Sequence, residues 1–144
     1  MAIIDLGNVW RIFSGDKSNP EAHKDLVKEV LLMTLARASS SDSNMNPVEV
    51  DTVQMVLKEV TGEDVSSADI RVAGSSELFE RAPLEKYLAS VASSLTPQDR
   101  ASIARSLARV IRSDVAITEQ ETAFFNKVAT ALEVTPAELA GLVD

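Results

Sequence analysis

The chain has 144 residues, a length typical of a single domain, and it carries a formal net charge of −8. It contains no cysteine, which excludes disulfides, thiolate zinc sites and cysteine nucleophiles. The charge is −5 over residues 1–72 and −3 over residues 73–144, so neither half favours nucleic acid or an anionic membrane surface. Cations and basic partners suit this chain better.

Apolar residues recur at helical spacing along almost the whole sequence, which predicts an all-α domain over residues 1–144. We expect a compact bundle of about seven to eight helices. The predicted helices lie near residues 3–13, 20–38, 47–61, 66–72, 76–94 (broken around Pro83), 97–112, 118–132 and 136–143.

Residues 1–19 are predicted to form an amphipathic helix and a linker, with Trp10 and Phe13 on the apolar face. Such a helix most often covers the core, and the alternative is docking to a partner or a membrane surface. No apolar run reaches the 18 residues of a membrane span, and the first residues do not resemble a secretory signal. We therefore expect a cytoplasmic protein without a transmembrane segment.

His23, the only histidine, falls near the start of the second predicted helix and is expected at the surface. Four later helix starts share one pattern, in which a cap residue precedes an acid at the third helical position, as in a capping box. These starts are Asn46–Glu49, Thr96–Asp99, Thr118–Glu121 and Thr135–Glu138.

One stripe of each amphipathic helix is predicted to face the core. The residues expected to be buried are Leu35, Leu88, Val91, Leu107, Ile111, Phe125 and Val128. Arg105, Arg109 and Arg112 form a basic stripe at i, i+4 and i+7. This stripe is typical of a solvated face with intramolecular ion pairs, and the alternative is a surface for an anionic partner.

An internal repeat is the most informative feature of the sequence. The pattern L-A-R-x4-D-x2-[MI]-[NT]-x2-E begins at Leu35 and again at Leu107, 72 residues later. We therefore predict two duplicated helix–loop–helix units, near residues 24–72 and 97–143. Segments 24–61 and 97–132 are expected to superpose as related hairpins.

A helix that ends near an acid, a short turn, a capped helix with glutamate at its third position and a closing helix together resemble the TerB-like (tellurite-resistance) family. The better match runs from Val110 to Leu139, and the resemblance covers about residues 20–143. The glycine usual at the family's turn is absent from both repeats. The resemblance implies kinship with the N-terminal helical domain of the membrane-anchored DnaJ co-chaperone. It also implies a role in tellurite or stress resistance, through protein contacts and an acidic surface suspected of binding divalent cations, without catalysis.

The repeated acids are candidate metal ligands, namely Asp42, Glu49, Asp114 and Glu121. Carboxylates suit Ca²⁺ or Mg²⁺, and a pseudo-two-fold arrangement would bring the four together. The alternative is that both glutamates serve only as helix caps. Asp42 and Asp114 lie four residues before the predicted caps, so that role does not require them.

Other site classes find little support. Asp42, Asn44 and Asn46 match the first ligands of a calcium loop, but Pro47 and Val53 stand where an EF-hand needs glycine and glutamate. The chain also lacks a glycine-rich phosphate loop, a G-x-S-x-G turn and an H-E-x-x-H motif. We therefore expect a non-enzymatic module with a protein partner. The remaining alternatives are a purely structural interaction domain and, more remotely, a metal-assisted hydrolase. The sequence does not indicate the oligomeric state.

Overall fold

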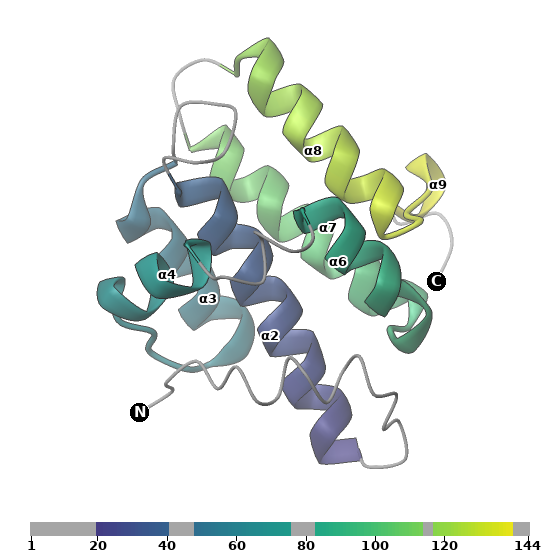
Figure 1. Cartoon of the computed structure of the whole chain (residues 1–144), viewed down its shortest axis with the longest axis horizontal. Coiled ribbons are helices and arrows are strands. Elements are labelled where there is room, and N and C mark those ends of the chain that lie inside the picture. The colour runs from purple at the N-terminus through teal and green to yellow at the C-terminus, as the bar shows by residue number, and fades with distance from the viewer. Residues whose placement is uncertain (1–19, 41–47, 76–82, 114–116, 140–144) are drawn as a thin grey trace.

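The computed structural model describes residues 20–40, 48–75, 83–113 and 117–139, which form only helices and connecting turns (Figure 1). These residues make seven α-helices and one short 3₁₀ helix. The elements are α2 (Pro20–Ser39), α3 (Val50–Thr61), α4 (Ser67–Gly74), α6 (Leu84–Val91), η1 (Ala92–Ser94), α7 (Pro97–Arg112), α8 (Glu119–Ala131) and α9 (Pro136–Leu139). The all-α prediction is confirmed.

Most predicted boundaries agree with these elements to within two residues. Pro83 takes an extended conformation (ψ 162°) just before α6 begins, which agrees with the predicted interruption at this residue. The start of α3 is different, since this helix begins at Val50 rather than near residue 47. The predicted helix over residues 3–13 and the segments 76–82 and 140–143 lie outside the described residues.

Three of the predicted capping boxes are present, and they set the starts of α7, α8 and α9. In each, the threonine hydroxyl accepts a hydrogen bond from the backbone N–H of the acid three residues later, and that acid accepts one from the threonine N–H. The hydrogen bond from the Thr135 backbone N–H lowers the pKa of Glu138 below its ordinary value.

Left-handed residues end two of the helices. Gly62 (φ 77°) follows α3 and donates its N–H to the Lys58 carbonyl. After α8 the left-handed residue is Glu133 (φ 58°), and the N–H of Val134 reaches back to the carbonyl of Ala129, as in a Schellman motif.

The core lies between two long helices, α2 and α7, which contact each other. Helix α2 also contacts α3 and α4, and α7 also contacts α8 and α9. Helix α6 lies in front of α7 in Figure 1, where it packs on α8 and also contacts α2. It contributes Tyr87 and Leu88, both fully buried. Each central helix is therefore covered by the two helices that follow it in its predicted repeat.

Residues 72 positions apart take similar places on the two central helices. Leu31 and Ile103 are buried, as are Leu35 and Leu107. Thr34 and Ser106 are also buried, and each hydroxyl donates to the carbonyl four residues earlier on its own helix. This hydrogen bond lets a small polar side chain face the core without an unsatisfied donor.

Six of the seven predicted core residues are buried, and Phe125 is the exception. Phe125 packs against the core but is only partly buried. The period of α8 correctly places it on the side facing α7. Part of its side chain lines a hollow in the surface. The helical period of the sequence does not indicate such a hollow.

Candidate functional site

Glu121 is the best-defined of the four candidate ligands. It lies at the third position of α8 and is 1% exposed. Its Oε1 accepts a hydrogen bond from the Thr118 N–H at 2.9 Å, so the predicted capping role is confirmed. Its Oε2 is buried and has no hydrogen-bond partner among the described residues. Capping therefore accounts for one oxygen of this carboxylate and leaves the other unexplained.

Glu49 does not take the same role in the first unit, so the predicted Asn46–Glu49 capping box is wrong. Because α3 begins at Val50, Glu49 is itself the N-cap residue, and its side chain makes no cap hydrogen bond. The side chain is exposed. The two glutamates that match in sequence are thus different in structure.

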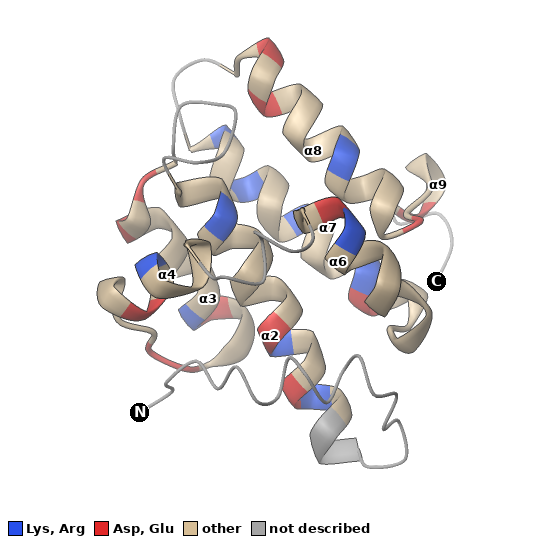
Figure 2. Cartoon of the chain, viewed as in Figure 1, with Lys and Arg blue, Asp and Glu red and all other residues tan. Residues whose placement is uncertain are grey.

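Asp42 and Asp114 lie outside the described residues, so their place relative to Glu49 and Glu121 stays a prediction. Over residues 20–40, 48–75, 83–113 and 117–139 no three His, Cys, Asp or Glu side chains gather as a metal site would require. Acidic and basic residues are instead interspersed over these helices (Figure 2).

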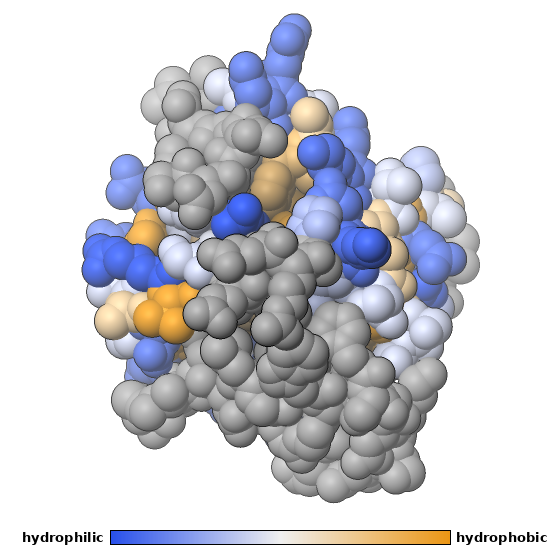
Figure 3. Space-filling model, viewed as in Figure 1, coloured by the Kyte–Doolittle hydropathy of each residue, from blue (hydrophilic) through white to orange (hydrophobic). Residues whose placement is uncertain are grey.

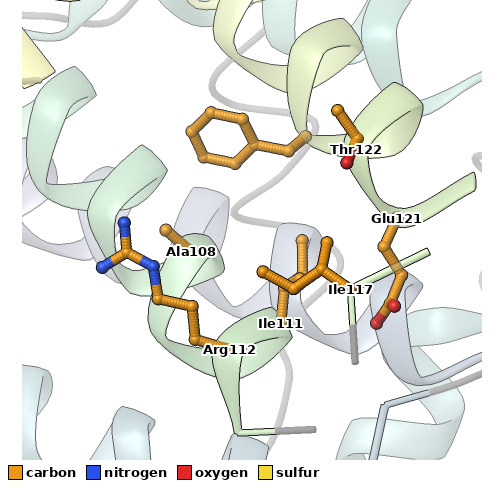
Figure 4. A pocket seen from close by; sticks show the side chains of 7 residues that line it. Ala108, Ile111, Arg112, Ile117, Glu121 and Thr122 are labelled. Atoms are coloured by element: carbon orange, nitrogen blue, oxygen red, sulfur yellow. The ribbon is translucent and has the colours of Figure 1, made fainter. Parts of the chain in front are cut away.

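A hollow of about 170 Å³ lies where the end of α7 meets the start of α8. Its wall is formed mainly by Ala108, Ile111, Ile117, Thr122 and Phe125. Two charged residues complete the lining, Arg112 on one side and Glu121 on the other, with the two isoleucines between them (Figure 4). Small-molecule pockets typically measure about 300–1,000 Å³, so this hollow is smaller than the usual site of an organic small molecule.

The three arginines of the basic stripe have separate roles. Arg105 donates to the carbonyls of Glu138 and Leu139, which end α9. Arg109 forms an ion pair with Glu59 of α3. Arg112 is exposed beside the hollow and makes no hydrogen bond or ion pair within the described part of the chain. All three arginines are exposed, as predicted for a solvated face. Within the described residues, the predicted internal ion pair is present only for Arg109.

His23 is partly exposed, and its side chain contacts another helix. Its Nε2 lies 2.9 Å from Oδ2 of Asp99, and the two side chains are 37% and 26% exposed. Asp99 is also the acid of the capping box at the start of α7, so this hydrogen bond joins α2 to α7. Trp10 and Phe13 lie outside the described residues, and their role stays a prediction.

The hollow and the His23–Asp99 hydrogen bond are the features that sequence reasoning missed. The sequence shows Arg112 only as one member of a stripe and Ile117 only as a variable position of the repeat. Asp99 was expected to be a cap, and no spacing links it to a histidine 76 residues away.

The comparisons with known proteins agree with this architecture. The sequence model of the family described as "Tellurite resistance protein TerB" matches residues 28–143. The chain belongs to the TerB family. No curated protein and no solved structure shows a significant match. Within the described residues, none of the helices in this TerB-family chain is long and apolar enough to cross a membrane.

Proposed function

We propose that this tellurite-resistance-type module acts by binding a protein partner in a cytoplasmic stress response, and that it catalyses no reaction. The observation that carries the proposal is the hollow beside α8, where apolar side chains are not covered by the described residues of the bundle. Ile117 at this hollow is 54% exposed. Partly uncovered apolar surface with a charged rim is the usual character of a protein-binding site.

The chemistry of the hollow also favours binding over catalysis. Its polar members are Thr122, Arg112 and Glu121, and Glu121 is already held in the helix cap. This set does not pair a nucleophile with a base, as a hydrolase of the alternative reading would require.

The cellular role can be tested by deleting the gene for this chain in its source organism and measuring growth on tellurite. We expect the deletion to raise sensitivity and the wild-type chain to restore growth. A variant with Leu107→Asp should fail to restore it, because Leu107 is fully buried and the charge would unfold the core. Equal growth of the deletion and parent strains on tellurite and on other oxidants would contradict the proposed role.

A divalent cation, Ca²⁺ or Mg²⁺, is the second candidate ligand, and the unpartnered Oε2 of Glu121 favours it. A buried carboxylate oxygen without a hydrogen bond is costly, and a bound cation would satisfy it. Asp114 would belong to the same site as Glu121. The matching residues of the first unit are Asp42 and the exposed Glu49. We propose these four residues as ligands of one ion or of two neighbouring ions.

This second proposal predicts a specific thermal response. Millimolar Ca²⁺ or Mg²⁺ should raise the melting temperature more than sodium chloride of equal ionic strength, because the ion binds only the folded chain. Glu121→Gln separates the cap from the charge, since glutamine at this position also completes a capping box. We expect Glu121→Gln and the double variant Asp42→Asn/Asp114→Asn to remove the response. An unchanged response in both variants would exclude the site.

A further inference from the structure

The hollow is lined by a residue of α8 whose counterpart in the first unit is fully buried. Phe125 is only partly buried, whereas Val53, which lies 72 positions earlier on α3, is fully buried. Val128 and Val56, the next pair at this offset, are both buried. The two units thus differ in burial at Phe125 and agree one turn later, at Val128.

The helices around α3 and α8 explain the difference. Helix α3 contacts α2, α4 and α7, so it is covered on several sides. In the described part of the chain, the extensive contacts of α8 are with α6 and α7, and α9 packs on α7. Figure 3 shows hydrophobic surface between α7 and the upper end of α8. Among the described helices, α8 thus has two extensive neighbours where α3 has three.

The charge at the rim indicates what kind of side chain would lie there. Arg112 is exposed and has no hydrogen bond or ion pair within the described residues, while Arg105 and Arg109 are engaged by α9 and α3. Glu121 on the opposite side has its Oε1 held by Thr118. A carboxylate on the occupant would therefore be drawn to Arg112 and away from Glu121.

The size of the hollow limits the apolar part of the occupant. A volume of about 170 Å³ suits one side chain rather than a whole small molecule. An amphipathic helix presents single aliphatic side chains with acids one turn away, and this is a common mode of recognition by helical bundles.

We propose that an amphipathic helix of a partner protein docks on the hollow. It inserts one aliphatic side chain between Ile117 and Phe125, and it places an Asp or Glu one helical turn away against Arg112. This docking site rests on the proposed protein-binding function and names its surface and the chemistry of its partner. Its test uses only the purified chain, so loss of the cellular role would leave this measurement unaffected.

The probe is an alanine-based helical peptide, blocked at both ends, with one leucine and one glutamate four residues apart. Titration of the ¹⁵N-labelled chain to millimolar peptide should shift the amides of residues 108–112 and 117–125. Replacing the peptide's glutamate by glutamine should weaken binding about fivefold, the upper range for one exposed ion pair. Replacing its leucine by alanine should weaken binding at least as much, because buried apolar surface is lost.

Variants of the chain make the test specific. Arg112→Glu should weaken binding of the glutamate peptide at least about fivefold. The same variant should bind more tightly a peptide in which lysine replaces the glutamate. Arg71→Glu is the matched control, because Arg71 is also exposed but lies on α4 and does not line the hollow. Ile117→Glu should abolish binding while the melting temperature is retained, since Ile117 is exposed.

Three outcomes would overturn the proposal. The first is no shift at the hollow at millimolar peptide, and the second is equal binding of all three peptides. The third is amide shifts at the hollow that depend on the concentration of the chain alone, which would assign the surface to a second copy of this chain.

Discussion

Tyr87 is fully buried on α6, and burial, with a further contribution from the negative charge of Glu29, raises the pKa of its phenol well above the ordinary value. It is the only tyrosine in the chain, so tyrosinate absorbance reports this side chain alone. Burial of the phenol therefore favours its neutral form in the native state.

We predict that Tyr87 stays protonated in the folded chain at pH values where free tyrosine ionises, near 10. In denaturant the absorbance should titrate near that ordinary value. Because the unfolded chain then loses a proton that the native chain keeps, the free energy of unfolding should fall as pH rises above about 10. Tyrosinate that appears near pH 10 before the loss of helical circular dichroism would contradict the buried position.

Gly74, at the end of α4, lies close to the backbone of α2. A Cβ at this position would lie 2.6 Å from the backbone oxygen of Ala36 on α2. The Gly74 carbonyl also accepts a hydrogen bond from Arg37. Only glycine allows this packing of α4 on α2 without moving backbone.

Gly74→Ala should lower the free energy of unfolding by about 1–3 kcal/mol, since the clash is with backbone and cannot be relieved by a rotamer change. Urea denaturation measures the loss. Ser75→Ala, at the neighbouring exposed position, should change it by less than about 0.5 kcal/mol. Equal effects of the two substitutions would mean that the helices separate freely.

At the scale of elements, three of the four predicted capping boxes are present, and the one in the first repeat is not. The boxes at Thr96, Thr118 and Thr135 depend only on a hydroxyl and an acid three residues apart, so local sequence was sufficient. At Glu49 the same spacing is present, but α3 begins one residue later than that glutamate. A capping preference of about 1 kcal/mol does not by itself set where a helix starts.

Thr118→Ala should lower the free energy of unfolding by roughly 0.5–2 kcal/mol, because the Glu121 N–H loses its acceptor at the start of α8. Thr122→Ala is a suitable control, as its exposed hydroxyl only donates to a carbonyl of the same helix. Thermal denaturation of both variants gives the comparison. A smaller loss for Thr118→Ala than for Thr122→Ala would show that the capping box does not hold this end.

At the scale of the whole molecule, the repeat predicts that segments 24–61 and 97–132 superpose. Both central helices contact the two helices that follow them, and they bury residues at the same offset of 72. Their surroundings differ, since α3 also packs on α7 whereas α8 packs on α6. We expect similar interhelical geometry within each hairpin in a crystal or solution structure. Clearly different crossing angles would remove the duplication argument.

The sequence by itself determined the class of fold, most helix boundaries, the three threonine caps and most of the core. These depend on period and on contacts within a few residues, which the chain carries locally. The family could be recognised for the same reason, because its repeated turn and caps are local patterns.

Only the tertiary structure decided which side chains line the hollow, which charged side chain is buried and which distant residues form a hydrogen bond. The spacing that makes Phe125 inward-facing is the same as that of Val53, yet one lies beside an open hollow and the other is covered. Burial of the whole Glu121 side chain and the pairing of His23 with Asp99 likewise depend on helices distant in sequence. A periodic pattern defines one side of a helix, but which other helix covers that side is a property of the assembled bundle.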